Sequence, residues 1–484
     1  MNPLKAWHLP PGFSFPLQGI EVPGGPRSPA FQYADFSDQG LRELMEFLRE
    51  EREHLLSSFT VSRVVDGVDR VAQRLLDEGD PLRARALEAL GPFSGFSPSM
   101  AEAVLDGMAR SWMRENLWDL VRSEFSDPAV LEGFRPGPPG TGTRALGFPL
   151  TFHLGAGTVP GVSTTSLIRG LLVKSAALLK PGLGDLPLSV VFVQALQEED
   201  PDLARCLAVV YWPSEERGRT ETALKGSDLV VAYGSDETIR WIRGHLPPQT
   251  PLRAYRHRMG FVLVGREALG AEGSSGGAGA WSVAREAARS VALFDQKGCV
   301  SPHVFFVEKG GEVDPGEWAG LLARAFHELE EVLPSGNISP EDGASLQQIR
   351  GVAELKEGLG EGMVLHGGDR APWTVLYRPG GSVEPSCLNR TVRVLPVEAL
   401  RDALEILKAW IPYLQTVGVA GLAGQTVEIR EGLARLGVSR ISDLGGVPWP
   451  RTWWHHDGSG PLLDLVRWTD VEGADAFSSG TDEE

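Results

Sequence analysis

A regular alternation of apolar runs with helical segments between residues 147 and 244 constrains the fold more than any other feature of this chain. The apolar runs predict strands at residues 148–154, 177–180, 206–212 and 228–233. The segments that follow them predict helices at residues 163–176, 188–197, 220–226 and 235–244. Strands and helices at this interval indicate a parallel sheet covered on both faces. We therefore expect an α/β protein with the general outline of a nucleotide-binding domain, although a fold alone does not fix a function.

The regions on either side of this alternation differ in texture. Residues 1–35 are rich in Pro and Gly and are expected to form an extended surface arm, and apolar residues at helical spacing follow from Ser37 to Gly79. Further helices are expected at residues 99–112, 115–125, 284–294, 315–332, 345–358, 398–410 and 425–436. Further strands are expected at residues 303–308, 374–377 and 391–397.

Composition excludes several classes of function. The formal net charge of −18 argues against nucleic acid or an anionic membrane surface as the main partner. No basic, apolar leader precedes Lys5, and no apolar run approaches the length of a membrane span. The 3 cysteines are too few and too scattered for a disulfide framework or a zinc site. We expect a cytoplasmic protein whose thiols stay reduced, with two or three domains.

One of those cysteines, Cys299, lies where a predicted helix gives way to a predicted strand, in the run Phe-Asp-Gln-Lys-Gly-Cys-Val-Ser-Pro-His of residues 294–303. Gly298 leaves room for a substrate to approach the thiol. A thiolate is a strong nucleophile, and a turn between two rigid elements can expose it. A small buried hydrophobe is the alternative, because free Cys is among the most buried residue types.

Two other turns carry candidate ligand-binding residues. The run at residues 228–239 reads as a buried strand, then Gly234-Ser235, then the start of a helix. Gly234 permits close approach of a backbone, and Ser235 can cap the helix with its amides facing a phosphate. Lys180 follows a buried strand, at the strand edge where open α/β sheets bind ligands. Either feature also occurs without a ligand in ordinary α/β proteins.

The run Trp453-Trp454-His455-His456-Asp457 near the C-terminus could suggest a metal site. Adjacent side chains on one strand point in opposite directions, and no other His lies nearby in the sequence, so a metal site is not favoured. We interpret this aromatic cluster as a packed closure of the C-terminal region.

Four stretches together resemble one known family. They are residues 294–303 around Cys299, residues 230–242 around Gly234, the run ending Leu-Leu-Lys-Pro-Gly at 178–182, and residues 452–468. From about residue 147 to the C-terminus the chain resembles the long-chain fatty acyl-CoA reductases of the bacterial luminescence type, a branch of the aldehyde dehydrogenase superfamily.

This resemblance implies an aldehyde-dehydrogenase-like fold: a Rossmann-type coenzyme domain, an α/β catalytic domain and a small oligomerisation element, preceded by a helical region. The implied divisions are residues 1–140 for the helical region, 141–283 for the NADP-binding domain, 284–412 for the catalytic domain, 413–472 for a segment returning to the coenzyme domain and to oligomerisation, and 473–484 for a disordered tail. A homodimer or homotetramer is implied as well.

The resemblance also implies roles for individual residues. Cys299 matches the catalytic thiol, Lys180 the lysine at the adenosine ribose of NADPH, and Gly234 with Ser235 the turn under the pyrophosphate. Thr158 falls where the superfamily commonly has an Asn that binds the oxyanion. Because Thr reaches less far than Asn, the Cys299 amide is expected to carry more of that role.

A second departure from the superfamily concerns water. Oxidising members have a Glu-Leu-Gly-Gly motif whose Glu activates water, whereas the equivalent run here, residues 252–261, has no carboxylate. An acyl-cysteine would then survive until hydride reduces it to an aldehyde. His257 lies in the same run and is a candidate acid/base for the thiol or for CoA, with a purely structural role as the alternative.

The expected activity is thus NADPH-dependent reduction of a long-chain acyl-CoA, or of an acyl group donated by a partner acyl-protein synthetase, with light emission and lipid products as possible outlets. Three alternatives stay open from the sequence. One is a CoA-acylating aldehyde dehydrogenase acting on shorter aldehydes, another is a non-catalytic scaffold with the same fold, and the third is reduction of an acyl phosphate.

Overall fold

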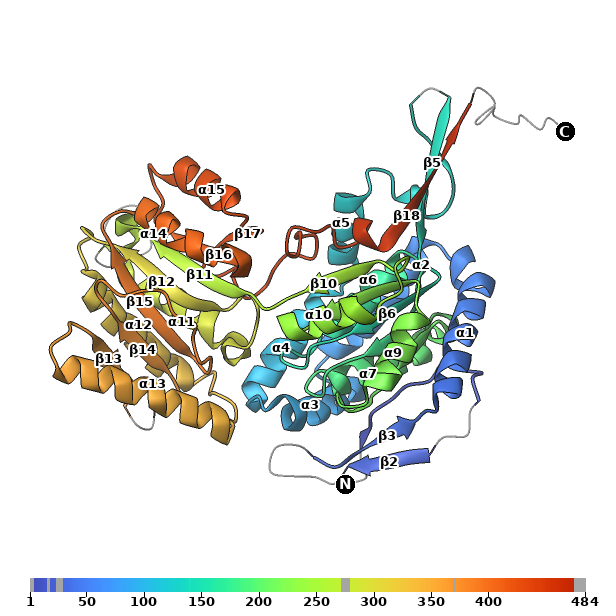
Figure 1. The fold of residues 1–484 in the computed structure, drawn as a ribbon, viewed down its shortest axis with the longest axis horizontal. Helices are drawn as coiled ribbons and strands as arrows, with labels where there is room; N and C mark the ends of the chain where they lie inside the picture. The colour runs from blue at the N-terminus through green and yellow to red at the C-terminus, as the bar shows by residue number, and fades with distance from the viewer. Residues whose placement is uncertain are drawn as a thin grey trace.

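The structure, a computed structural model, describes residues 4–14, 18–22, 29–138, 140–270, 279–368 and 371–473. Two α/β lobes lie side by side, each built on its own sheet (Figure 1). One sheet has five strands in the order β10-β9-β6-β7-β8, and the other has seven in the order β13-β14-β15-β12-β11-β16-β17. The predicted α/β class is confirmed. Apart from Gly473, the tail predicted for residues 473–484 lies outside the described residues.

The five-stranded sheet is entirely parallel. Its strands are β6 (Leu150–Leu154), β7 (Ala176–Lys180), β8 (Leu207–Val209), β9 (Leu229–Tyr233) and β10 (Leu252–Tyr255). The helices between them are α6 (Val162–Leu172), α7 (Leu186–Glu199), α8 (Pro201–Arg205), α9 (Arg217–Lys225) and α10 (Asp236–His245). The chain adds β7 and β8 on one side of β6 and then β9 and β10 on the other. Open α/β sheets bind ligands at such a reversal of strand order, outside the carboxyl ends of the strands.

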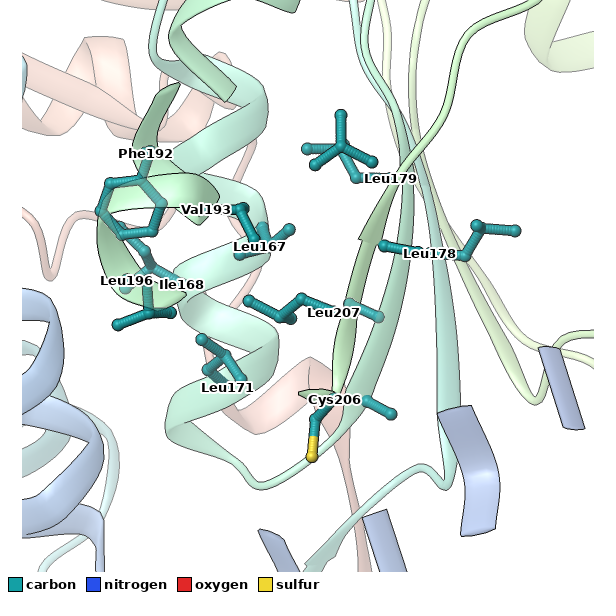
Figure 2. Packing of buried hydrophobic residues seen from close by; sticks show 14 of the residues in the cluster. Leu167, Ile168, Leu171, Leu178, Leu179, Phe192, Val193, Leu196, Cys206 and Leu207 are labelled. Carbon is teal, nitrogen blue, oxygen red and sulfur yellow. The ribbon is translucent and has the colours of Figure 1, made fainter. Parts of the chain in front are cut away.

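The core of this lobe explains the apolar runs in the sequence. Figure 2 shows side chains of α6 and α7 packed together beside the strands β7 and β8. All of those labelled are buried: Leu167, Ile168 and Leu171 of α6, Phe192, Val193 and Leu196 of α7, Leu178 and Leu179 of β7, and Leu207 of β8. Cys206, expected to begin a strand, instead caps the short helix α8 and is buried in the same core. Burial raises the pKa of its thiol to about 12, so Cys206 is a packing residue.

The N-terminal helices extend this core. They are α1 (Asp38–His54), α2 (Val61–Leu76), α3 (Pro81–Ser94), α4 (Pro98–Ser111) and α5 (Arg114–Glu124). Their buried residues join the cluster of the five-stranded lobe, except that Met100 and Val104 of α4 join the cluster of the seven-stranded lobe. Helix α3 was not expected, because Gly91 and Pro92 interrupt its pattern. Where an extended arm was expected, β1 (Leu4–Lys5), β2 (Gln18–Val22) and β3 (Phe31–Asp35) form a small sheet.

The seven-stranded sheet is parallel except for its edge strand β13 (Val364–His366). Its other strands are β11 (Met259–Val264), β12 (Pro302–Glu308), β14 (Thr374–Tyr377), β15 (Thr391–Val397), β16 (Leu414–Ala420) and β17 (Arg440–Asp443). Alternate residues serve opposite faces. Val262 and Phe305 pack with α11 (Ala280–Ala292) and α12 (Pro315–Glu330), whereas Phe261 and Phe306 pack with α14 (Leu400–Leu407) and α15 (Thr426–Arg435). Helix α13 (Pro340–Gly358) packs beside the edge strand β13.

The chain passes between the lobes earlier than the sequence indicated. Strand β10 ends at Tyr255 in one sheet and β11 begins at Met259 in the other, whereas the expected boundary was 283/284. The segment expected to leave the catalytic domain at residue 413 first adds β16 and β17 to the seven-stranded sheet. Only then does the chain return, and β18 (Val466–Glu472) pairs with β5 (Thr141–Gly147) and, through it, with β4 (Arg135–Pro136) in an arm that projects from the molecule (Figure 1).

At the junction of the two lobes, strand ends of one sheet face strand ends of the other (Figure 1). The carboxyl ends of β6, β9 and β10 and the amino ends of β11, β12 and β16 are directed toward this junction (Figure 1). None of the described helices combines the length and the apolar character needed to cross a bilayer.

Candidate active site

A cavity of about 470 Å³ lies at the junction of the lobes. Its walls come from the loops that follow β6 and β9, from residues 255–258 between β10 and β11, from the loop that precedes β12, and from residues 448–456. Five of the six sequence-predicted site residues line it, namely Cys299, His257, Thr158, Gly234 and Ser235. This size is typical of a pocket for a small-molecule ligand, about 300–1,000 Å³.

Cys299 lies in a loop between a helix and a strand, as predicted, but the helix ends two residues earlier than expected. Helix α11 stops at Ala292, and Phe294, Asp295 and Gln296 have left-handed φ angles of 59°, 48° and 63°. Such conformations are unfavourable for residues other than Gly and persist only where surrounding contacts hold them. They turn the chain so that Cys299 is partly exposed to the cavity and not sealed in the core.

A second left-handed run holds the first. Leu388, Asn389 and Arg390 also have positive φ angles. The buried Arg390 guanidinium donates to Asp295 Oδ1 through Nε and Nη2, at 3.0 and 2.8 Å. The side-chain oxygen of Gln296 accepts from the backbone amide of Thr391 at 2.8 Å. Its side-chain Nε2 donates to the backbone carbonyl oxygens of Thr391 and Pro302. The cysteine loop is therefore fixed by buried polar contacts to the loop that precedes β15.

The thiol itself lies beside a polar cluster from distant parts of the chain. Burial and the Asp457 carboxylate raise the pKa of Cys299 to about 11, although Gln415, the Cys299 amide and Arg258 act in the opposite direction. Asp457 accepts from Arg258 Nε at 3.0 Å and from Gln415 Nε2 at 2.6 Å. At this pKa the thiol is protonated at neutral pH, and the thiolate, which is the reactive form, is disfavoured.

Three histidines line the cavity together with Cys299, namely His257, His303 and His456. His303, at the start of β12, is buried, and its Nδ1 accepts from the Ser386 amide at 3.3 Å. That contact assigns the proton of the neutral ring to Nε2, so His303 presents an N–H donor. Burial, with smaller effects from His257 and Arg393, lowers the pKa of His303 to about 4 and keeps the ring neutral. His257 is exposed at the cavity wall.

Thr158 is positioned by the start of α6. Gly161 has a left-handed φ of 96°, and the amides of Gly161 and Ser163 donate to the two carboxylate oxygens of Asp185 at 2.6 and 2.7 Å. Asp185 is fully buried, and burial raises its pKa to about 6. The loop that carries Thr158 is thus anchored to the segment between β7 and α7, with the Thr158 side chain exposed at the cavity wall.

Gly234 and Ser235 form the turn from β9 into α10, as expected. The Ser235 hydroxyl caps α10 by accepting from the Thr238 amide at 3.2 Å, and a Cβ on Gly234 would lie 3.1 Å from the Thr238 side chain. Lys180 is not among the residues that line the cavity. It is buried at the end of β7 with its Nζ 5.5 Å from the Tyr211 ring and 5.7 Å from the Trp212 ring, and burial lowers its pKa to about 8.

The cavity is electropositive. Five basic side chains line it, Arg169, Arg256, Arg258, Lys297 and Arg451, and no Asp or Glu does so among the described residues. Such a lining fits a phosphorylated coenzyme, whose charges need cationic partners, and the Gly234 turn leaves its backbone open to close approach. Among the described residues, no group of three or more His, Cys, Asp or Glu side chains could hold a metal ion.

Several of these residues escaped sequence reasoning. Asp457 was weighed as a metal ligand and interpreted as part of an aromatic closure, yet it lies beside Cys299, and its left-handed φ of 54° precedes Gly458 at 80°. His456 is stacked on Tyr255 with ring centroids 4.2 Å apart and on Trp454 at 4.6 Å. The signal for Asp457 and His303 was their place inside the quoted motifs. Gln415, Arg258 and Arg169 left no signal in the sequence.

Comparison with known proteins agrees with this geometry. Residues 56–468 match the family model described as acyl-CoA reductase (LuxC). The chain belongs to this family. The long-chain acyl-protein thioester reductase of Aliivibrio fischeri is 24% identical over 421 residues, which are 86% of this chain and 83% of that protein. The corresponding protein of Vibrio harveyi is 23% identical over 423 residues, 86% of this chain and 84% of the other.

Solved structures show the same fold at low identity. A putative aldehyde dehydrogenase PutA from Anabaena variabilis matches with a TM-score of 0.70 and 16% identity, covering 96% of this chain and 100% of its own. An aldehyde dehydrogenase from Brucella melitensis biovar abortus 2308 matches with a TM-score of 0.73 and 11% identity, covering 97% of each chain. The LuxC-family chain thus has the aldehyde dehydrogenase fold. It is an acyl reductase, and its fold implies a nicotinamide coenzyme.

Proposed function

We propose that this LuxC-family protein reduces long-chain acyl thioesters to fatty aldehydes with NADPH, and that Cys299 carries the acyl group as a thioester. The observation that supports this most directly is a nucleophile-bearing cavity without a carboxylate. Cys299 opens into a cavity between the lobes that is lined by cationic, hydroxyl-bearing and apolar side chains. This combination suits transfer of an acyl group to sulfur and its protection there.

Acylation begins with loss of the Cys299 proton. Because the thiol pKa is raised to about 11, the thiolate forms only when a bound ligand changes its surroundings, and Arg258 and Gln415 are placed to favour it. The sulfur attacks the acyl carbonyl and the donor thiol leaves. Thr158 and the Cys299 amide are the candidate donors to the oxyanion, and the neutral His303 Nε2–H is a third. His257 is the candidate that accepts the Cys299 proton and then passes it to the departing thiolate.

The lining of the cavity then protects the acyl-enzyme from water. Hydrolysis would need a base next to a water molecule, and the side chains of residues 255–258 in the bridge between β10 and β11 are Tyr255, Arg256, His257 and Arg258. None of these is a carboxylate, and the Asp457 carboxylate beside the thiol accepts hydrogen bonds from Arg258 and Gln415 and is not among the residues that line the cavity.

The coenzyme supplies a hydride when it is bound. Gly234 and Ser235 are the candidates to hold its pyrophosphate, with Arg256 and Lys297 as cationic partners. Lys180 is the candidate for its adenosine ribose, since its buried Nζ has aromatic neighbours and makes no ion pair among the described residues. With the coenzyme bound, its hydride would reduce the acyl carbon, and breakage of the carbon–sulfur bond would release the aldehyde and restore the Cys299 thiolate.

The donor that we propose first is an acyl group carried on a partner protein, because several relatives are named for acyl-protein thioesters. Acyl-CoA is the second donor. Assays of NADPH consumption with matched acyl chains on CoA and on an acyl-protein synthetase would rank the two. A preference for short acyl chains would instead favour the CoA-acylating alternative.

The test of the function is covalent labelling. Wild-type protein incubated with a radiolabelled long-chain acyl donor should take up about one acyl group per chain and release it as aldehyde when NADPH is added. Cys299→Ala should lose both the labelling and the aldehyde, while Cys387→Ala, which changes the other partly exposed thiol, should keep both. Acylation that persists in Cys299→Ala would contradict the proposal.

A further inference from the structure

Arg169 is a buried cation, and no ion-pair partner for it lies among the described residues. It lies on α6, only 8% of its surface is exposed, and it lines the interlobe cavity. Its Nε is fully buried without a hydrogen-bond partner, and within the described part of the chain its guanidinium takes part in no ion pair. A buried charge that is neither paired nor hydrogen-bonded is strongly unfavourable, so this site calls for an anion.

The surroundings of Arg169 are aromatic and can donate hydrogen bonds. Burial raises the pKa of both Tyr233 and Tyr255, and the Arg169 charge acts on each in the opposite direction. Burial, with smaller effects from Arg169 and Arg258 and against the Asp457 charge, lowers the pKa of His456 to about 3. The Tyr233 and Tyr255 rings are stacked with centroids 4.6 Å apart. A guanidinium beside two phenols and a neutral imidazole is suited to one compact anionic group.

The cavity face of α6 has an amphiphilic pattern. Val162, Thr165 and Arg169 all line the cavity, while Leu167 and Leu171 point to the core on the opposite side of the helix. Val162 packs against the apolar cluster that includes Val159 and Phe294. Seven residues of α-helix span about 10 Å, so this wall passes from apolar side chains to a guanidinium within that distance.

The other cations of the cavity occupy different positions. Arg256 and Arg451 are exposed, and Arg258 is paired with Asp457. Lys297 is half-buried, with its Nζ 5.2 Å from the centre of the Phe96 ring. The exposed pair therefore meets charged ligands such as phosphates near solvent, while Arg169 lies beyond them among apolar and aromatic side chains. An anion attached to a long apolar chain matches this arrangement better than a phosphate.

We infer that the cavity binds long-chain fatty carboxylates, with the carboxylate on Arg169 and the alkyl chain along the apolar end of α6. The inference rests on the proposed function, since the carboxylate would share the acyl-chain site. The free fatty acid is then a competitor of the acyl donor, and the protein responds to the ratio of acid to thioester. Binding requires no bond to Cys299 and no coenzyme.

The experiment measures direct binding of dodecanoate and of dodecan-1-ol, both below their aggregation limits, by calorimetry with the full chain. Wild type and Cys299→Ala should both bind dodecanoate at least about tenfold more tightly than the alcohol, as a charge-assisted contact implies. In Arg169→Met the affinity for dodecanoate should fall to that for the alcohol, and the alcohol affinity should stay the same. Arg256→Gln removes an exposed cavity cation and should retain the preference.

Arg169→Lys keeps the positive charge but lacks the paired N–H donors of the guanidinium, so its preference for dodecanoate over dodecan-1-ol should be intermediate. This variant keeps the inference testable if the Met variant does not fold. Equal affinities for acid and alcohol in wild type would overturn it. So would an unchanged preference in Arg169→Met or Arg169→Lys, or a loss of NADPH binding in either variant without loss of dodecanoate binding. The proposed function can fail separately, because its labelling test depends on Cys299 and these binding measurements do not.

Discussion

At the scale of single residues, the site is organised around a thiol that its own surroundings keep protonated. Cys299 is largely buried at the cavity wall, and Asp457 adds a negative charge next to it. The cost of forming a thiolate is offset only by Gln415, Arg258 and backbone amide contacts. We therefore expect this thiol to resist modification at neutral pH.

Alkylation of Cys299 should therefore rise steeply with pH. With a thiol pKa of about 11, the thiolate fraction increases about tenfold for each pH unit between 7 and 10, with no plateau near pH 8.5. Asp457→Asn removes the charge that disfavours the thiolate and frees Arg258, so the pKa should fall and iodoacetamide should react faster at pH 8. The measurement is the rate of labelling of the Cys299 peptide by mass spectrometry. Slower labelling in Asp457→Asn would contradict this account of the thiol.

The missing carboxylate provides a second prediction at this scale. His257→Glu places an acid on the exposed wall of the cavity, where it can activate water, and should raise the yield of fatty acid relative to aldehyde several-fold. His257→Gln has a similar size without the charge and serves as the control. The products are separated by chromatography after a single turnover. Equal acid yields from the two variants would show that a carboxylate at this position does not determine the fate of the acyl group.

At the scale of elements, two loops with left-handed residues support each other below the cavity. The segment 294–296 follows α11, the segment 388–390 precedes β15, and a buried Arg390–Asp295 pair joins them, with Glu330 of α12 as a further partner of Arg390. The strained backbone persists because buried hydrogen bonds hold it on both sides. The same contacts fix the position of Cys299.

Arg390→Met should therefore reduce both stability and acylation. Removing the cation leaves Asp295 buried without its charge partner, a change that costs about 3–5 kcal/mol in the free energy of unfolding. Arg324→Met breaks the exposed pair with Glu328 and should cost about 0.5 kcal/mol or less. Denaturant unfolding of the two variants measures the difference. A cost below about 1 kcal/mol for Arg390→Met would mean that this pair does not hold the loop.

Elements with local signals were predictable from the sequence, and those that depend on distant partners were not. The strand at residues 176–180 and the helix at 236–245 were found within one or two residues, because apolar runs and a Ser cap mark them. Strand β11 was not predicted from the sequence, because Arg residues lie close to it on both sides. In the structure it lies between β12 and β16, and all of its residues are buried. The left-handed residues 294–296 continue a helical pattern and leave it only because Arg390 and Thr391 hold them.

The same division applies to the site. Cys299, His257, Thr158, Gly234 and Ser235 were named from motifs, and the fold brings them to one cavity. Arg169 lies in the mostly buried helix α6, and Gln415 lies in the buried part of β16. Their importance depends on which side chains face them across the lobes, and that information is not local.

At the scale of the whole molecule, β4, β5 and β18 form an arm that extends beyond both lobes (Figure 1). Strand β18 is an edge strand of seven residues, mostly exposed, and Trp468 on it is 47% exposed. A long edge strand with unpaired backbone groups can pair with another chain. We propose that this arm joins copies of the chain into a dimer or tetramer.

Trp468→Glu should weaken that assembly, because it places a charge where a partner would bury an aromatic ring. Light scattering after size exclusion should show a lower mass for the variant at equal concentration. Arg467→Glu changes the charge of the same strand without removing an aromatic side chain and should have a smaller effect. A wild-type chain that is monomeric at micromolar concentration would rule out the proposed role of the arm.

The central claim is that Cys299 holds an acyl group in a cavity that excludes hydrolysis until the coenzyme arrives. The most direct measurement follows the radiolabelled acyl-enzyme, freed of excess donor, with and without NADPH. We predict that the label stays on the Cys299 peptide for many turnover times without NADPH and leaves almost entirely as fatty aldehyde when NADPH is added. Rapid release as fatty acid in the absence of NADPH, or label on a residue other than Cys299, would contradict the claim.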